Sequence, residues 1–208
     1  MKGLEKPLAL FLFALFALPT TPATRTSYSI DPQLSKIEIQ VARDGFLKAF
    51  GHDHLVSATQ YSGEIQFDAA KLEESLVAFT VESSSLKVVD PGESEKDRSE
   101  VQATMLGEAV LDAAKHPQIK FSSASVKPGS SASQLAVEGT VTLHGVSKPL
   151  TIPVRFELGK DGTLTADAEV SLLQSDFGIV PYKAAGGAVR VKDKLKLTFH
   201  IVGRKASN

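Results

Sequence analysis

Hydrophobic residues occupy every second position over most of the stretch 134–158, and this alternation constrains the fold more than any other feature of the chain. Polar residues such as Glu138 and Thr142 separate them in the first half, and the pattern starts again after Gly145. Because successive side chains of a strand point to opposite faces of its sheet, a period of two predicts strands with one buried face. The short segment between the two runs contains His144 and Gly145, and it predicts an antiparallel hairpin. The chain is therefore expected to be a β protein.

The same alternation recurs along most of the chain, with one exception. Between residues 101 and 114 the apolar residues are spaced three and four positions apart, which predicts a helix with one apolar face, ended by His116 and Pro117. The charged run before it, up to Glu100, is expected to form a solvated loop and a first helical turn. The chain as a whole is expected to be all-β, with about eight antiparallel strands and one inserted helix. The other alternating runs include 37–41, 61–67, 77–81, 164–172 and 195–201.

The interior of such a protein can be hollow or filled. Strands with one apolar face close into a barrel or stack as a sandwich, and the alternation does not choose between them. In a barrel of about eight strands the interior either fills with side chains or holds one small ligand. Small residues share the inward face with larger ones, as Gly63 does with Phe67 and Ala166 with Leu164. These small residues leave room for a cavity, while a packed core with ordinary size variation is the alternative.

The N-terminus has the layout of a secretory signal peptide. Lys2 and Lys6 precede an apolar run over 8–18, and small residues follow up to Ala23. The run is shorter than the ~20 residues that a membrane-spanning helix needs. We therefore expect a cleavable signal peptide at 1–23, a mature domain at 24–208 without an integral membrane span, and a periplasmic or secreted location. An uncleaved anchor is the alternative.

Composition narrows the function further. The net charge of −1 gives no signal for nucleic acid, and the absence of cysteine excludes disulfides and thiolate metal sites. No Gly-x-Ser-x-Gly or His-Glu-x-x-His motif is present, so we expect no enzyme, although distant carboxylate pairs of the glycosidase kind stay open. The length fits one domain. The oligomeric state is left open, a homodimer included.

Five short motifs follow one another along the chain. They are Tyr-Ser-Ile-Asp at 28–31, Gly-Glu-Ile-Gln-Phe at 63–67, His-Pro-Gln-Ile-Lys-Phe-Ser at 116–122, the hairpin at 139–149 and Asp-Phe-Gly-Ile at 176–179. Each motif is weak alone, but their order and spacing over nearly the whole domain resemble the YceI-like family of periplasmic, lipocalin-like lipid-binding proteins. The resemblance implies an antiparallel, eight-stranded lipocalin-like barrel that holds a polyisoprenoid, quinone or other long-chain amphiphile and needs no cofactor.

The chain departs from this family pattern at two places. Many members carry an arginine two positions before the Asp-Phe-Gly segment, where this chain has Gln174. The segment Gly-His-Asp-His at 51–54 resembles a subgroup of the family and not its commoner form. A role of that arginine in holding a head group or the loop is therefore in doubt here.

A lipid carrier needs a long apolar cavity, in which each buried methylene group contributes roughly 0.8 kcal/mol. The alternating faces supply candidates for its lining, and structural core is an equally good interpretation of any one of them. To these the family motif at 176–179 adds one phenylalanine. The candidates are Ile37, Ile39, Val41, Phe67, Phe79, Val141, Ile152, Phe156, Phe177 and Phe199.

Two histidines complete the candidate site. In an extended segment His52 and His54 point the same way and Asp53 points to the opposite side, where we expect it to brace the loop. The histidines are interpreted as contacts to a ligand head group at the pocket entrance, as structural residues of a turn, or as half of a zinc, copper or iron site. A metal site would need further ligands. His144 and His200 are expected on polar strand faces, away from the lumen.

Three hypotheses follow. A carrier of a hydrophobic small molecule or lipid requires a continuous apolar tunnel. A metal-dependent protein organised on His52 and His54 requires a third ligand that converges on them. A packed domain that binds a protein partner requires an exposed apolar patch and no cavity.

Overall fold

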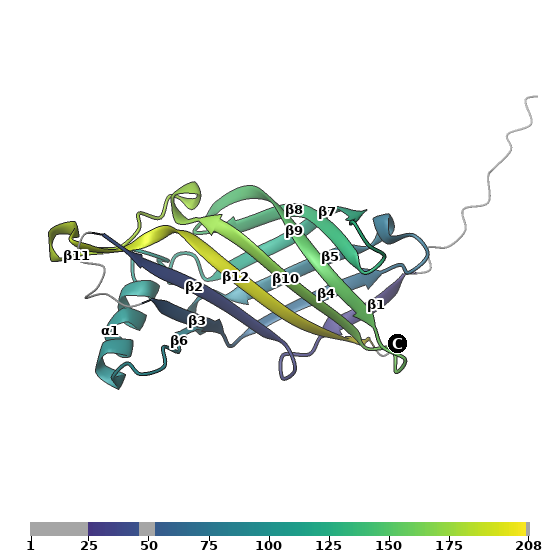
Figure 1. The fold of residues 1–208 in the computed structure, drawn as a ribbon, viewed down its shortest axis with the longest axis horizontal. Helices are drawn as coiled ribbons and strands as arrows, with labels where there is room; N and C mark the ends of the chain where they lie inside the picture. Colours follow the sequence, from purple (N-terminus) through teal and green to yellow (C-terminus); the bar gives the residue numbers. More distant parts are fainter. Residues whose placement is uncertain (1–24, 46–52, 207–208) are drawn as a thin grey trace, which may run out of the picture.

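The computed structural model describes residues 25–45 and 53–206, which form an antiparallel sheet curled into an elongated barrel with helix α1 (Glu95–Leu106) at one end (Figure 1). The predicted signal peptide and His52 lie outside the described residues. The strands are β1 (Thr26–Ile30), β2 (Lys36–Asp44), β3 (His54–Ala58), β4 (Tyr61–Phe67), β5 (Leu76–Glu82), β6 (Leu86–Val88), β7 (Gln118–Pro128), β8 (Gln134–Leu143), β9 (Val146–Leu158), β10 (Leu164–Leu173), β11 (Lys183–Ala184) and β12 (Val189–Lys205).

Six of the short strands combine end to end into three long ones. β1 and β2 lie along the same edge of β12, since Tyr28 pairs with Lys205 and Lys36 with His200. β4 and β3 pair with β1 and β2 in turn, and β5 and β6 pair with β4 and β3. The ring then runs through β7, β8, β9 and β10 back to β12. The result is a closed antiparallel barrel of eight long strands, which confirms the predicted fold class.

The hairpin that dominates the sequence is formed by β8 and β9. Its two turn residues, His144 and Gly145, have φ angles of 51° and 74°, as a tight turn with left-handed residues at both central positions requires. Pro153 lies one residue beyond the last pair between β9 and β10, Val154 with Ala168, so its missing N–H interrupts no ladder on that side. Beyond this point β9 and β10 are no longer paired by backbone hydrogen bonds.

The predicted helix is displaced along the chain. Instead of 101–114, α1 spans Glu95–Leu106 and includes the charged run up to Glu100, of which only a first turn was expected to be helical. The helix begins early because the Ser94 hydroxyl accepts a hydrogen bond from the Asp97 N–H, and because Glu95 and Asp97 suit the positive end of the helix dipole. After Gly107 the chain continues in turns, so the apolar residues that follow reach the core without being helical.

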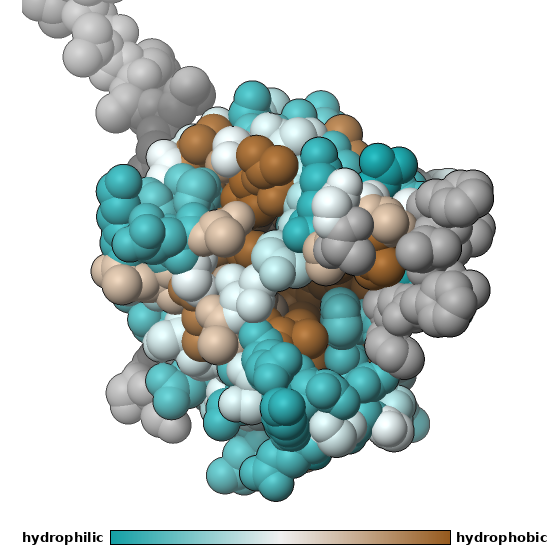
Figure 2. Space-filling view, turned by 90° about the vertical axis from the view of Figure 1, so that its left-hand side faces the viewer, coloured by the Kyte–Doolittle hydropathy of each residue, from teal (hydrophilic) through white to brown (hydrophobic). Residues whose placement is uncertain are grey.

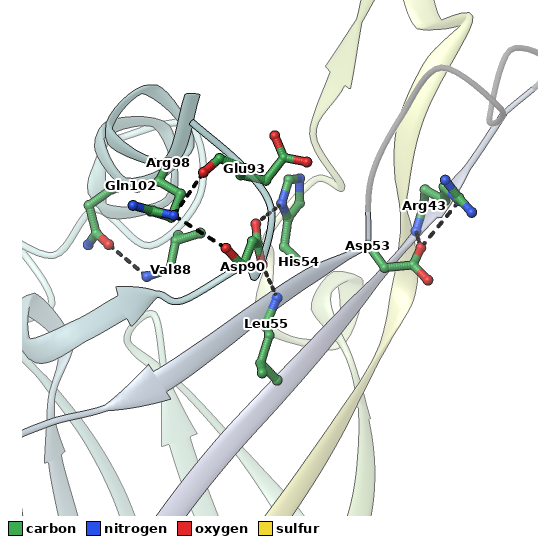
Figure 3. Close-up of polar contacts among 9 residues, drawn as sticks. All are labelled: Arg43, Asp53, His54, Leu55, Val88, Asp90, Glu93, Arg98 and Gln102. Atoms are coloured by element: carbon green, nitrogen blue, oxygen red, sulfur yellow. Dashed lines mark hydrogen bonds and ion pairs between the residues drawn. The ribbon is translucent and has the colours of Figure 1, made fainter. Parts of the chain in front are cut away.

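Helix α1 is attached to the barrel through a side-chain amide. β6 pairs with β3 on one edge, and the described residues provide no strand for its other edge. The side chain of Gln102 lies there instead: it accepts from the Val88 N–H at 2.8 Å (Figure 3), and it donates to the Leu86 carbonyl at 2.7 Å. One glutamine thus satisfies the backbone groups that a neighbouring strand would satisfy.

Loss of this amide should loosen the helix and the edge together. Gln102→Ala is expected to lower the free energy of unfolding by about 1–3 kcal/mol, since two partly buried backbone groups lose their partner. The Val88 amide should exchange with deuterium faster than in the wild type. Gln118→Ala is the control, because Gln118 only meets Glu82 on the exposed surface. Equal unfolding and exchange in the two variants would contradict the role given to Gln102.

Candidate ligand-binding cavity

A cavity of about 510 Å³ occupies the barrel interior. Its volume lies within the range of roughly 300–1,000 Å³ that is common for small-molecule pockets. The lining consists almost entirely of Ile, Val, Leu, Phe and Ala side chains from the inner faces of the strands, with Val101 and Met105 added by α1. The lining residues that carry polar groups are His54, Ser75, Glu100, Thr104, Lys120, Gln174 and Tyr182.

The cavity opens at the end of the barrel that carries α1. Figure 2 views this end and shows hydrophobic residues around a hollow, surrounded by hydrophilic residues. Val180 and Tyr182, on the segment before β11, are exposed by 67% and 44%, and Tyr182 also lines the cavity. At the other end Tyr28 is buried to 1% exposure, and Gly203 allows it to pack closely, since a Cβ there would lie 3.1 Å from the Tyr28 Cβ. An apolar chain can therefore enter the cavity at the α1 end.

Most of the residues predicted to line a cavity do so. His54 lines the cavity at its entrance. All of the predicted hydrophobic residues that lie on strands also line the cavity: Ile37, Ile39, Val41, Phe67, Phe79, Val141, Ile152, Phe156 and Phe199. Phe177 is the exception, because it lies in the 3-10 turn η4 (Gln174–Phe177), where strand alternation does not apply. It is buried to 2% exposure, and its carbonyl accepts from Nδ1 of His144 at 3.2 Å.

The imidazole of His54 is fixed by a buried carboxylate. Nδ1 of His54 lies 2.7 Å from Oδ2 of Asp90, whose side chain is exposed by only 4% (Figure 3). The other carboxylate oxygen of Asp90 accepts from the Leu55 N–H. Sequence reasoning missed Asp90, which is 36 positions from its partner. The carboxylate fixes the orientation of the ring.

Asp53 points to the opposite side of β3 from His54, as expected for an extended segment (Figure 3). Its Oδ1 accepts from the backbone N–H of Arg43 at 2.9 Å and lies 3.6 Å from Nε of the same residue. Asp53 therefore ties the start of β3 to the end of β2, in agreement with the predicted bracing role.

Comparison with known proteins identifies the family. A sequence model described as the YceI-like domain matches residues 28–203. The chain belongs to the YceI-like family. A UPF0312 protein of Pseudomonas syringae pv. tomato is 31% identical over 97% of this chain and its own full length, and Protein YceI of Salmonella agona is 28% identical over 74% and 73% of the two chains.

Solved structures agree on the fold. Burkholderia cenocepacia BcnA superposes with a TM-score of 0.67 at 22% identity, covering 83% of this chain and 98% of that one. A structure described as a polyisoprenoid binding domain from Saccharophagus degradans has a TM-score of 0.62 at 12% identity, covering 87% and 99%. At these identities the likeness concerns the barrel itself.

Gln174, which departs from the expected family pattern, has a structural function in this chain. Gln174 is exposed by 5%, lines the cavity, and donates from Nε2 to the Lys192 carbonyl at 2.8 Å. Lys192 lies where the register between β12 and β2 shifts, and such an irregularity leaves backbone groups to be satisfied by side chains. The next residue, Asp193, accepts from the backbone and hydroxyl of Ser175. Both contacts fasten η4 to β12.

The contact between Ser175 and Asp193 also affects the pKa of the Asp193 carboxyl group. The hydrogen bond from the Ser175 hydroxyl, followed by that from its backbone N–H, holds the pKa of Asp193 below the ordinary carboxyl value. The ionised form is therefore favoured by folding, so the contact contributes its full stabilisation above the ordinary pKa and loses it as the pH falls through the lowered one.

No metal centre is evident in the part of the chain that the structure describes, where no group of three or more His, Asp or Glu side chains could hold an ion. Nδ1 of His54 is already bound by Asp90. The rings of His116 and His144 meet edge to face with centroids 4.6 Å apart, and His200 pairs with Asp167 on the outer surface. His52, the other histidine of the metal hypothesis, lies outside the described residues.

Among residues 25–45 and 53–206, no helix is both long enough and hydrophobic enough to cross a membrane.

Proposed function

We propose that this YceI-like protein is an exported, non-enzymatic carrier that holds a long-chain amphiphile, such as a polyisoprenoid, a quinone or a fatty-acid derivative, inside its barrel. The observation that carries the proposal is the apolar cavity of about 510 Å³ with an entrance at one end. The alternating strand faces supply an inner surface that gains free energy from every methylene group it covers.

Three further observations support the proposal. One solved structure with the same fold is described as a polyisoprenoid binding domain, which suggests the class of ligand. The basic start, apolar run and small residues of 1–23 support export. Polar lining groups such as His54 and Gln174 each have a structural hydrogen bond, and no nucleophile with a base beside it occurs among the described lining residues.

The two other hypotheses fit less well. A packed interaction domain conflicts with the cavity. A metal-dependent protein organised on His52 and His54 would need a ligand set that the described residues do not provide.

Displacement of a fluorescent probe tests the carrier proposal. The fluorescence of N-phenyl-1-naphthylamine is expected to rise in the presence of the mature protein at one equivalent per barrel, and dodecan-1-ol is expected to reverse the rise. A probe that stays unbound, or that long-chain competitors leave in place, would contradict the proposal.

A further inference from the structure

We propose that the head group of the ligand is a hydrogen-bond donor without negative charge, such as the hydroxyl of a long-chain alcohol or the ammonium of a long-chain amine, and that Nε2 of His54 accepts its hydrogen bond. This inference rests on the proposed function and adds the chemistry of the head group to it.

His54 stands at the boundary of two environments. Its side chain lines the apolar cavity, and it also lines a separate polar recess beside α1, together with Asp90, Glu93, Asp97, Arg98, Glu100 and Val101. An amphiphile whose tail fills the barrel therefore brings its head group to this residue. The exposed fraction of the His54 side chain is 19%, so the ring is reached through the entrance.

The contact with Asp90 decides which nitrogen can accept. An ionised carboxylate only accepts hydrogen bonds, so Nδ1 of His54, 2.7 Å from Oδ2 of Asp90, carries the proton. In the neutral imidazole the other nitrogen, Nε2, is then an acceptor. Nε2 has no hydrogen-bond partner among the described residues. A hydroxyl or ammonium group can donate to it, whereas an ether or a carboxylate cannot.

The charges around His54 also disfavour an anion. Among the described residues, the recess carries the carboxylates of Asp90, Asp97 and Glu100 against one guanidinium group, that of Arg98. Nη1 of Arg98 already donates to the carbonyl of Glu93 at 2.8 Å and to that of Asp90 at 3.5 Å (Figure 3). A carboxylate or phosphate head group would therefore meet repulsion.

Three described cations at this end of the barrel and the dipole of α1 do not reverse that preference. Lys120 borders the cavity but is exposed, and because Ile119 and Phe121 on either side of it face inward, its side chain is directed to the outer face of β7. Arg43 and Arg190 pair with Asp53 and Asp44. The positive end of α1 is already occupied by acidic side chains in its first turn.

Two uncharged probes isolate the donor requirement. Dodecan-1-ol and dodecyl methyl ether share one tail, and only the alcohol can donate. Competing for the fluorescent probe at about pH 8.5, where histidine is ordinarily neutral, the alcohol is expected to bind about three- to tenfold more tightly, the value of one hydrogen bond. Dodecylamine is expected to bind more tightly than dodecanoate.

Asp90→Asn should remove or invert this preference without emptying the cavity. The Leu55 N–H needs an oxygen at the Oδ1 position, so the amide nitrogen of the new asparagine faces Nδ1 of His54. That nitrogen donates, Nδ1 becomes the acceptor, and Nε2 carries the proton. The ether should then bind at least as tightly as the alcohol. Asp167→Asn is the matched control, because it makes the same change in the exposed pair of Asp167 with His200, at 2.8 Å on the outer face.

The outcomes separate the inference from the proposed function. Equal affinity of the wild type for alcohol and ether, or tighter binding of dodecanoate than of dodecylamine, overturns the inference while the carrier stands. Failure of every dodecyl probe to bind overturns the carrier and the inference with it. Should Asp90→Asn not fold, His54→Phe replaces it, and persistence of the alcohol preference in that variant also overturns the inference.

Discussion

Ala168→Phe is expected to weaken the binding of a long-chain amphiphile about 200-fold while the barrel stays folded, since exclusion of about four methylene groups at roughly 0.8 kcal/mol each costs about 3 kcal/mol. Ala168 is one of the small inward residues of β10, opposite Phe199 of β12, and it lines the cavity. A phenyl ring at this position enters the space that the tail would occupy. Displacement titrations with dodecan-1-ol measure the loss.

The control for this variant is Ser171→Phe. Ser171 lies three residues further along β10, is exposed, and alternates with the cavity-lining residues Val170 and Leu172. Its ring therefore points outward, and the affinity should change by less than about twofold, as for most surface substitutions. Unfolding curves of both variants should resemble that of the wild type. If Ala168→Phe folds and binds as tightly as Ser171→Phe, the ligand does not lie in the cavity.

Affinity is also expected to rise steeply with the length of the tail. In a series of n-alkanols each added methylene group should tighten binding about fourfold, because roughly 0.8 kcal/mol is gained per buried group. The rise should stop when the chain fills the cavity, since further carbons stay in water. Competition against the fluorescent probe, below the solubility limit of each alkanol, gives the slope.

The same series in Ala168→Phe provides the control. The slope per methylene group should be unchanged for short alkanols, and the plateau should be reached at a shorter chain. A slope near zero in the wild type would mean that tails do not enter an apolar interior. A slope without any plateau would mean that the chain is bound on an open surface and not in a closed barrel.

Much of this fold can be predicted from alternation because a barrel wall has one apolar face along every strand. Ile37 and Phe199 were predicted as lining for that reason, and they pair across β2 and β12. The interruptions of the long strands are harder to predict. Between β5 and β6, for example, the turn Ser83–Ser85 breaks the strand, and its position depends on contacts with Thr59 and Pro117, far away along the chain.

The errors concern places where local structure depends on single contacts. The helix was displaced because an apolar spacing continues past Gly107, while the cap at Ser94 determines where the helix begins. Phe177 was counted as lining because its neighbours suggested a family motif, but its backbone forms a 3-10 turn. Asp90 was missed because nothing near it in sequence indicates His54 as its partner. Sequence periodicity predicts which face of a strand is buried. It does not identify contacts between residues far apart in the sequence, such as that of His54 with Asp90.

Native mass spectrometry of the mature protein, purified gently from an exporting host, tests the central claim most directly. We expect one adduct of lipid mass on the barrel, released on activation and identified by fragmentation as a long-chain amphiphile. Ala168→Phe prepared in the same way should lose the adduct, and Ser171→Phe should retain it. Bare wild-type protein in every preparation, or an adduct that Ala168→Phe retains in full, would contradict the account of a lipid held inside the barrel.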